Sequence, residues 1–304
     1  MNEYKYEEKK DYELLDFGSV PLQNKEDLLE DLSGITNYYL EGDLSRLTAI
    51  ATLANIDVSK IKDFSNVFSQ DGHEYYQFTF PEELIPGVQA WDVSKAENME
   101  NMFRGCTNFN VNITGWDVRN VKKMNGMFLG CESFNQDIGG WNVSNVTDMS
   151  AMFKGCTNFN QDIGSWDVRR VRDMQNMFES CTSFNQNIGN WDVKNVSNMF
   201  SMFMECTNFN QDLSGWDVRN VKHFVGMFFE ANNFEFQNLP LFNMDLIDTK
   251  IKFEDLMLPQ IEDIPDAHEI YMNRHSQYRF MRNQYRLRQT QGSSSLFAGY
   301  YFVL

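Results

Sequence analysis

The chain has 304 residues, of which 42% are hydrophobic and 14% aromatic, a composition typical of a folded protein with a large core. Its formal net charge is −17, with the largest acidic excess in residues 1–90, and such a negative field argues against binding to nucleic acid or anionic membranes. The sequence shows no apolar signal segment and no run of about 18 uncharged apolar residues, which predicts an intracellular or virion protein without a lipoprotein leader or membrane span.

Residues 1–55 are predicted to form an N-terminal arm and a helical cap. Residues 1–17 are charged and rich in tyrosine, which is typical of an extended arm. A helix is predicted from Asn24, because asparagine is a preferred N-cap and Asp27 stands three positions later. Its apolar face consists of Leu28, Leu29, Leu32 and Ile35. Together with a second short apolar segment at Leu44–Asn55, this helix is expected to cover the apolar end of the repeats that follow.

Residues 56–236 repeat with a period of 25 residues. The repeat contains every tryptophan of the chain, Trp91, Trp116, Trp141, Trp166, Trp191 and Trp216, and every cysteine, Cys106, Cys131, Cys156, Cys181 and Cys206. A fixed period over six units predicts a solenoid, in which each unit buries its apolar side only by stacking on its neighbours. A degenerate first coil begins at Ile56, and the additional residues before Trp91 predict a loop insertion at 69–87.

One unit, Ile138–Cys156, shows how each coil is expected to fold. Trp141–Val143 alternates between apolar and polar residues as a short half-buried strand does. The apolar residues after it have the i, i+3, i+4, i+7 spacing of one helical face; they are Met149, Met152, Phe153 and Cys156. A polar return runs from Cys156 to Ile163. The predicted fold class is therefore an α/β repeat solenoid with a short strand, a short helix and a polar return in each coil.

The pattern I-x-x-W-x-V-x-x-V followed by M-x-x-M-F-x-x-C-x-x-F resembles the BspA-like leucine-rich repeats of about 25 residues that occur in bacterial and mycoplasma surface proteins. The resemblance covers roughly half of the chain. It implies a right-handed, leucine-rich-repeat-like solenoid that binds other macromolecules and has no catalytic activity of its own.

The cysteines allow two interpretations. Stacked coils lie about 4.8 Å apart, which is close enough for disulfides between neighbouring cysteines. However, side chains in such a column point the same way, and the number of cysteines is odd, so we expect free, buried thiols. Residues 25 apart lack the close pairs of a zinc site, and the chain has only four histidines. No metal or other cofactor is therefore predicted.

Two columns of aspartates recur with the period. The first is Asp92, Asp117, Asp167, Asp192 and Asp217, with Asn142 once, and the second is Asp137, Asp162 and Asp212. Such columns can bind calcium between coils, or each carboxylate can accept a hydrogen bond from a backbone amide in a turn. Uniform columns single out no carboxylate pair for hydrolysis, and no nucleophile, zinc or nucleotide motif is present. A non-enzymatic protein is predicted.

The outward residues of the predicted strand form the candidate partner-binding surface: Asp117, Arg119, Asn142, Ser144, Asp167, Arg169, Asp192, Lys194, Asp217 and Arg219. Leucine-rich solenoids offer this face to protein partners, as the resemblance implies. The alternative is a solvated surface whose charges compensate one another.

Residues 237–265 are predicted to be a C-terminal cap, and residues 266–304 an amphipathic helix and tail. Tyrosines spaced by seven lie beside arginines in this helix and are candidate contact residues: Tyr271, Tyr278, Arg279, Arg282, Tyr285 and Arg286. The helix either contacts other chains or packs on its own repeats.

Two functions follow from these patterns. The first is a protein interaction scaffold that binds a macromolecular partner through the strand face of the solenoid. The second is a structural component of a larger assembly, such as a virion or an envelope scaffold, docked through its terminal arms on other subunits.

Overall fold

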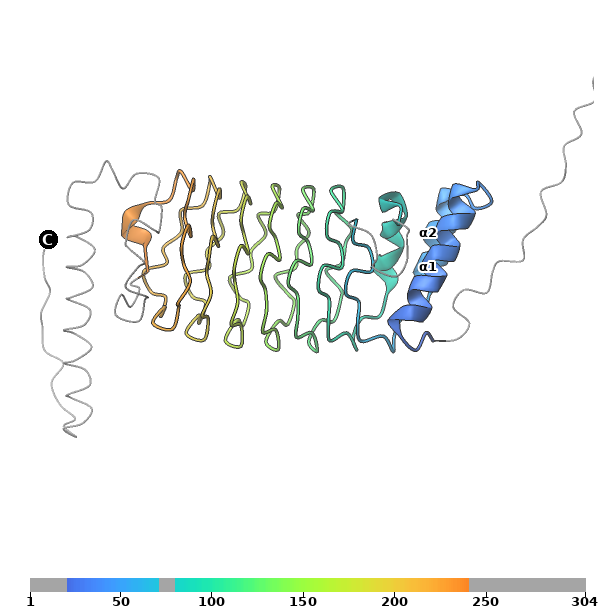
Figure 1. Cartoon of the computed structure of the whole chain (residues 1–304), viewed down its shortest axis with the longest axis horizontal. Helices are drawn as coiled ribbons and strands as arrows, with labels where there is room; N and C mark the ends of the chain where they lie inside the picture. The colour runs from blue at the N-terminus through green and yellow to red at the C-terminus, as the bar shows by residue number, and fades with distance from the viewer. Residues whose placement is uncertain (1–20, 71–79, 241–304) are drawn as a thin grey trace, which may run out of the picture. The chain divides into compact units, whose positions relative to one another are not determined.

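The structure is a computed structural model, and it describes residues 21–70 and 80–240 (Figure 1). The predicted arm at 1–17 and the predicted tail at 266–304 lie outside the described residues. The predicted C-terminal cap at 237–265 is described only as far as Pro240, and the predicted insertion at 69–87 is described only in part.

From Ile56 onward the chain winds into coils that lie side by side in sequence order (Figure 1). Parallel β-bridges join each coil to the next; the bridging residues are Asp63, Asn98, Lys123, Asp148, Asp173, Asn198 and His223. Successive bridging residues are 25 positions apart from Asn98 onward, and Asp63 and Asn98 are 35 apart because the insertion lies between them. The sequence period is therefore one turn of the chain.

The segment Met149–Cys156, for which the spacing predicts a helix, is instead a run of tight turns that carries the hydrogen bonds between coils. Backbone N–H groups of alternate residues donate to the next coil, as from Ala151 to Gln175 O (2.7 Å). The N–H groups between them donate three residues back within the same coil. The i, i+3, i+4, i+7 spacing thus correctly places these side chains inside, but it does not make the backbone helical.

The segment Trp141–Val143, for which the alternation predicts a strand, contains none of the bridges among the described residues. Hydrogen bonds at both of its ends close turns within the coil, from Trp141 N–H to Ile138 O (3.0 Å) and from Val146 N–H to Val143 O (2.9 Å). Trp141 and Val143 are buried as the alternation predicts, whereas the bridges that join the coils lie at the Asp148 position.

The core consists of columns of identical side chains stacked along the coils. The ring of Phe153 stacks on that of Phe178 in the next coil with centroids 5.7 Å apart, and on Phe159 in its own coil at 4.2 Å. The separation between coils lies within the 4.5–7 Å range of favourable aromatic pairs, and the contact within the coil is slightly closer. The tryptophans form a third column, in which no side chain is more than 5% exposed. The buried position of the repeat tryptophans is confirmed.

The N-terminal end of the coils adjoins helices α1 (Lys25–Leu40) and α2 (Arg46–Asn55) (Figure 1). Helix α1 begins as predicted, because Asn24 Oδ1 accepts from Asp27 N–H (2.9 Å) and Asp27 Oδ2 accepts from Gln23 N–H (3.1 Å). The predicted apolar face of α1 is buried. Lys25 Nζ donates to Ser65 Oγ of the first coil (2.9 Å), which ties α1 to the coils.

The described end of the insertion is not a loop but the 3₁₀ helix η1 (Glu82–Ala90), which packs on α2. A Cβ atom on Gly87 would lie 2.7 Å from Ile50 O and 2.8 Å from Leu53 Cβ, so only glycine allows this approach. Trp91 Nε1 then donates to Leu53 O (2.9 Å) and joins the first full repeat to α2.

The insertion also interrupts a hydrogen-bond pattern. Trp141, Trp166, Trp191 and Trp216 each donate Nε1 to the carbonyl of the residue 28 positions earlier. For Trp116 that residue is Val88 in η1, and the Trp116 Nε1 is buried without a partner among the described residues. An unpaired buried donor costs about 1–3 kcal/mol.

At the other end, the last described coil continues into the 3₁₀ helix η2 (Phe236–Asn238) and the buried Leu239. Leu213 N–H donates to Asn238 O (3.0 Å), which joins η2 to the preceding coil. Within residues 21–70 and 80–240, no helix combines the length and apolar character required to cross a membrane.

Replacing Trp166 with Phe should cost about 1 kcal/mol more free energy of unfolding than replacing Trp116 with Phe. The two changes remove similar volumes from the core, but only Trp166 donates Nε1 to a carbonyl, that of Ile138 (3.1 Å). Chemical denaturation of both variants measures the difference. Equal losses would mean that the indole hydrogen bonds contribute nothing to stability.

Replacing Gly87 with Ala should destabilise the junction between η1 and α2 by at least about 1–3 kcal/mol, because the new methyl group overlaps Ile50 O and Leu53. Gly140→Ala is the matched control, since no atom lies within 4 Å of a Cβ built there. Thermal unfolding of the two variants is the measurement. A Gly87→Ala protein as stable as the control would contradict the close packing.

Candidate interaction surface

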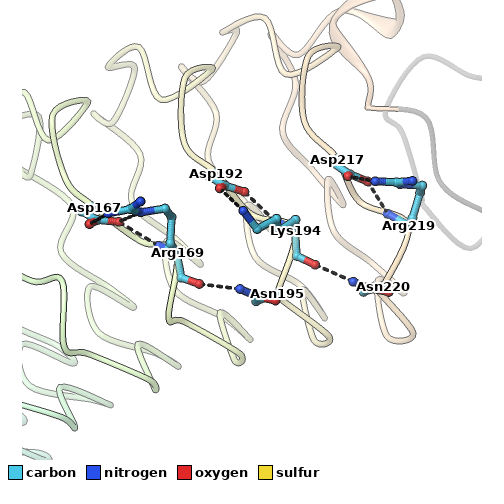
Figure 2. Close-up of polar contacts among 8 residues, drawn as sticks. All are labelled: Asp167, Arg169, Asp192, Lys194, Asn195, Asp217, Arg219 and Asn220. Atoms are coloured by element: carbon cyan, nitrogen blue, oxygen red, sulfur yellow. Dashed lines mark hydrogen bonds and ion pairs between the residues drawn. The ribbon is translucent and has the colours of Figure 1, made fainter. Parts of the chain in front are cut away.

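Six coils display a polar pair just after the tryptophan. The first is Asp92 with Ser94, and the other five, which we call the Asp–Arg column, are Asp117 with Arg119, Asn142 with Ser144, Asp167 with Arg169, Asp192 with Lys194, and Asp217 with Arg219. Its members are the ten residues that the sequence assigns to the partner-binding face. The structure brings the two residues of each coil into contact, a pairing that the sequence did not predict, and Figure 2 shows the last three pairs.

The Asp167 pair shows how a coil builds this contact. Arg169 lies two residues after Asp167, and its backbone N–H donates to Asp167 Oδ1 (3.2 Å), which closes a turn on the carboxylate. The guanidinium then reaches the same carboxylate through Nε to Oδ1 (2.8 Å) and Nη2 to Oδ2 (2.6 Å). Each aspartate therefore serves both as a turn cap and as the partner of a cation.

The Asn142 pair keeps this geometry without charge. Ser144 donates both its backbone N–H (3.2 Å) and its hydroxyl (2.7 Å) to Asn142 Oδ1. The backbone therefore requires an oxygen acceptor at this position but no carboxylate.

Hydrogen bonds from arginine keep two carboxylates of the column ionised. The hydrogen bonds from Arg169 lower the pKa of Asp167, and those from Arg119 lower the pKa of Asp117 in the same way. The Asp167 carboxylate raises the pKa of the Arg169 guanidinium in turn. The Arg169 side chain is 65% exposed and that of Asp167 34%, so solvent screens the pair and it contributes little to stability. Asp117 and Asp167 are therefore held as charged groups and are not poised to exchange a proton near neutral pH.

Asparagines fix the column relative to the neighbouring coils. Asn195 Nδ2 donates to Arg169 O (2.7 Å), and Asn220 Nδ2 donates to Lys194 O (2.6 Å), as Figure 2 shows. In earlier coils Asn145 Nδ2 donates to Arg119 O and Asn120 Nδ2 donates to Ser94 O in the same way. In one coil Arg170 takes this position and donates Nη1 to Asn145 Oδ1 (2.8 Å) instead. The backbone beneath the column is therefore bonded from coil to coil.

The second column of acidic residues also serves turns. Asp137 Oδ1 accepts from Gly139 N–H (3.1 Å), Asp162 Oδ1 from Gly164 N–H (2.9 Å), and Asp212 Oδ1 from Ser214 N–H (2.9 Å). Asn187 makes the same bond, which again shows that charge is not required. In the described part of the chain, no three His, Cys, Asp or Glu side chains gather as a metal site needs. These contacts favour the turn interpretation over calcium.

The sequence analysis missed a column of asparagines on the polar return. Asn135 Oδ1 accepts from the backbone N–H of Asn160 (3.0 Å) and from Gln161 Nε2 (2.9 Å), both in the next coil. The equivalent bonds recur at Asn110, Asn160 and Asn185. The repeated F-N-Q spacing was the available signal, because a side-chain amide at a fixed period can replace backbone bonds between coils.

The cysteines belong to the core. All five are free and buried, and each Sγ lies 2.7–3.1 Å from a phenylalanine carbonyl of the preceding coil. Burial raises the pKa of every one of these thiols, that of Cys106 to about 12. They are therefore inert as nucleophiles or metal ligands near neutral pH.

The remaining predicted contact residues, Tyr271, Tyr278, Arg279, Arg282, Tyr285 and Arg286, lie outside the described residues. No geometry is assigned to them.

Comparison with known proteins gives one family. A family model described as "Mycoplasma protein of unknown function, DUF285" matches residues 74–182 and, in a second overlapping match, residues 158–256. The two matches together cover more than half of the chain and include every complete repeat. No curated protein and no solved structure matches the chain.

In the folded protein all five thiols should resist alkylation up to about pH 9, because burial keeps them protonated. After denaturation without reductant, five equivalents of reagent should be taken up. The pKa of each thiol is higher in the folded than in the unfolded chain. The free energy of unfolding should therefore be unaffected by thiol ionisation below about pH 8.5 and should fall as the pH rises further. Uptake of three equivalents or fewer would reveal cross-linked coils.

Proposed function

The chain belongs to the family described as "Mycoplasma protein of unknown function, DUF285", and we propose that it is a non-enzymatic scaffold that binds a protein partner through its Asp–Arg column. We further propose that the stacked coils form a right-handed solenoid of the BspA-like leucine-rich-repeat type. The support for this proposal lies in the M-x-x-M-F and C-x-x-F spacing and in the coil-to-coil bridges at the same period.

The observation that carries the binding proposal is the preorganisation of the column. Each pair is closed on itself by a turn, and the backbone beneath it is bonded to the next coil through an asparagine. Side chains that are already ordered lose little conformational entropy when a partner binds. Alternating charges at regular spacing also favour one register of a partner over others.

The same geometry argues against catalysis at the column. A general acid requires a carboxyl group whose pKa is raised toward neutrality, whereas hydrogen bonds to arginine lower the pKa of Asp117 and Asp167. The contacts are also repeated nearly unchanged from coil to coil, so no single carboxylate is set apart as a reactive group.

The test replaces three charged pairs with the neutral pair that the chain itself uses at Asn142 and Ser144. The variant combines Asp167→Asn with Arg169→Ser, Asp192→Asn with Lys194→Ser, and Asp217→Asn with Arg219→Ser. Because asparagine keeps the turn acceptor, the melting temperature should stay within a few degrees of the wild-type value. The full-length chain identifies the partner by pull-down and mass spectrometry. Capture of that partner should fall at least about tenfold in the variant.

Asp162→Asn is the matched control, because it copies Asn187 in a turn outside the column. It should leave both stability and capture unchanged. A partner that the triple-pair variant captures as well as the wild type would refute binding through the column. If capture is instead lost only on truncation after Pro265, the alternative of an assembly component docked through its terminal arms is favoured.

A further inference from the structure

The last two described coils carry an apolar patch on the segment that bonds the coils together. Phe200 is 41% exposed, and no other large hydrophobic side chain of the described coils is exposed. Val225 occupies the same position one coil later and is partly exposed. In the two preceding coils this position is held by Ser150 and Gln175.

A second position changes in the same two coils. Met204 and Phe229 are partly exposed four residues after Phe200 and Val225. The two preceding coils have Lys154 and Glu179 at this position, and the coil before those has Leu129. The change from polar to apolar therefore affects two outward positions at once. In repeat proteins, variation from one unit to the next on an outward face is typical of a binding face.

Backbone bonds hold these side chains next to one another. Ser201 N–H donates to Val225 O (3.0 Å), and Glu205 N–H donates to Phe229 O (2.7 Å), so the two coils are paired on both sides of the patch. Phe200 therefore lies next to Val225 of the following coil along the chain, and Met204 lies next to Phe229.

Two glutamates border the apolar area at positions that the earlier coils give to glycine. Glu205 and Glu230 have φ values of 59° and 57° at a position that holds Gly105, Gly130 and Gly155 in earlier coils and Ser180 (φ 60°) in the coil directly before them. A left-handed conformation costs a residue other than glycine roughly 1–2 kcal/mol. The chain therefore carries two acidic side chains beside the patch although glycine fits the backbone better.

We propose that this surface, which we call the Phe200 patch, is a docking site for a segment of a partner protein that combines apolar side chains with Lys or Arg. Its members are Phe200, Met204, Val225, Phe229, Glu205 and Glu230. The apolar side chains bury the partner's apolar groups, and the two carboxylates pair with its cations.

Charge decides against two other occupants. Phosphate groups of a nucleic acid would be repelled by Glu205 and Glu230. A second copy that docked with its own patch would place equal carboxylates against one another, which is unfavourable in a symmetric contact. The Phe200 patch also lies on a different part of the coil from the Asp–Arg column, and it does not depend on binding there.

Three labelled synthetic peptides test the proposal by fluorescence anisotropy with the full-length chain. One alternates lysine with phenylalanine and leucine, a second replaces each lysine with glutamate, and a third keeps the lysines but replaces the apolar residues with serine. The lysine–apolar peptide should bind at least about tenfold more tightly than either of the others. The serine peptide measures simple attraction to the negatively charged chain.

Substitutions copied from neighbouring coils locate the site. Phe200→Gln reproduces Gln175 and should weaken the lysine–apolar peptide at least about tenfold, whereas Gln175→Ser, which copies Ser150, should not. The double variant Glu205→Gly and Glu230→Gly restores the glycine of the repeat. It should melt at or above the wild-type temperature and yet bind this peptide more weakly.

Several results would overturn the proposal: no binding of the lysine–apolar peptide, equal binding of all three peptides, or unchanged binding by Phe200→Gln. If the chain self-associates in sedimentation experiments and Phe200→Gln abolishes this association, the patch binds a second copy of the chain instead. The triple-pair variant of the Asp–Arg column should bind the peptide normally, so failure of one proposal does not affect the other.

Discussion

The structure depends on the stacking of each side chain on its own counterpart one coil away. Phe153 lies on Phe178 and Phe159 lies on Phe184, with ring centroids 5.7 and 5.9 Å apart. The backbone hydrogen bonds of the M-x-x-M-F segment join the same two coils. Both contacts require neighbouring coils to follow nearly identical paths. A change in the path of one coil therefore disturbs the packing of two others, which explains the uniform period.

That constraint determines where polar residues are used. Inside the stack the tryptophan Nε1 groups of four successive coils each have a partner in the adjacent coil, as Trp166 Nε1 does at Ile138 O. On the surface, aspartate and asparagine close the turns, and either residue suffices, as Asp162 and Asn187 show. Charge is therefore free to vary at the turn positions without loss of the backbone structure, and the Asp–Arg column uses this freedom.

Departures from the repeat are informative for the same reason. Trp116 loses its acceptor where η1 replaces the regular coil, and Glu205 and Glu230 occupy left-handed positions that glycine would occupy at lower energy. The first departure follows from joining the coils to α2. The second places two carboxylates in the last coils, of which Glu205 accepts a hydrogen bond from Ser180 Oγ (2.6 Å). Together with the exposed Phe200 it distinguishes the end of the stack from its middle.

The sequence by itself determined the period, the set of buried side chains and the start of α1, because burial and capping depend on residue type at short spacing. It also identified the polar positions of the Asp–Arg column. It did not determine the backbone path of Met149–Cys156, since a helix and a run of turns bury the same four residues. The tertiary structure decided this, because each alternate N–H finds its acceptor about 24 residues away in the next coil, as Ala151 does at Gln175. The pairing of Asp167 with Arg169, the asparagine bonds between coils and the Phe200 patch depend on that path, and spacing alone therefore left them undetermined.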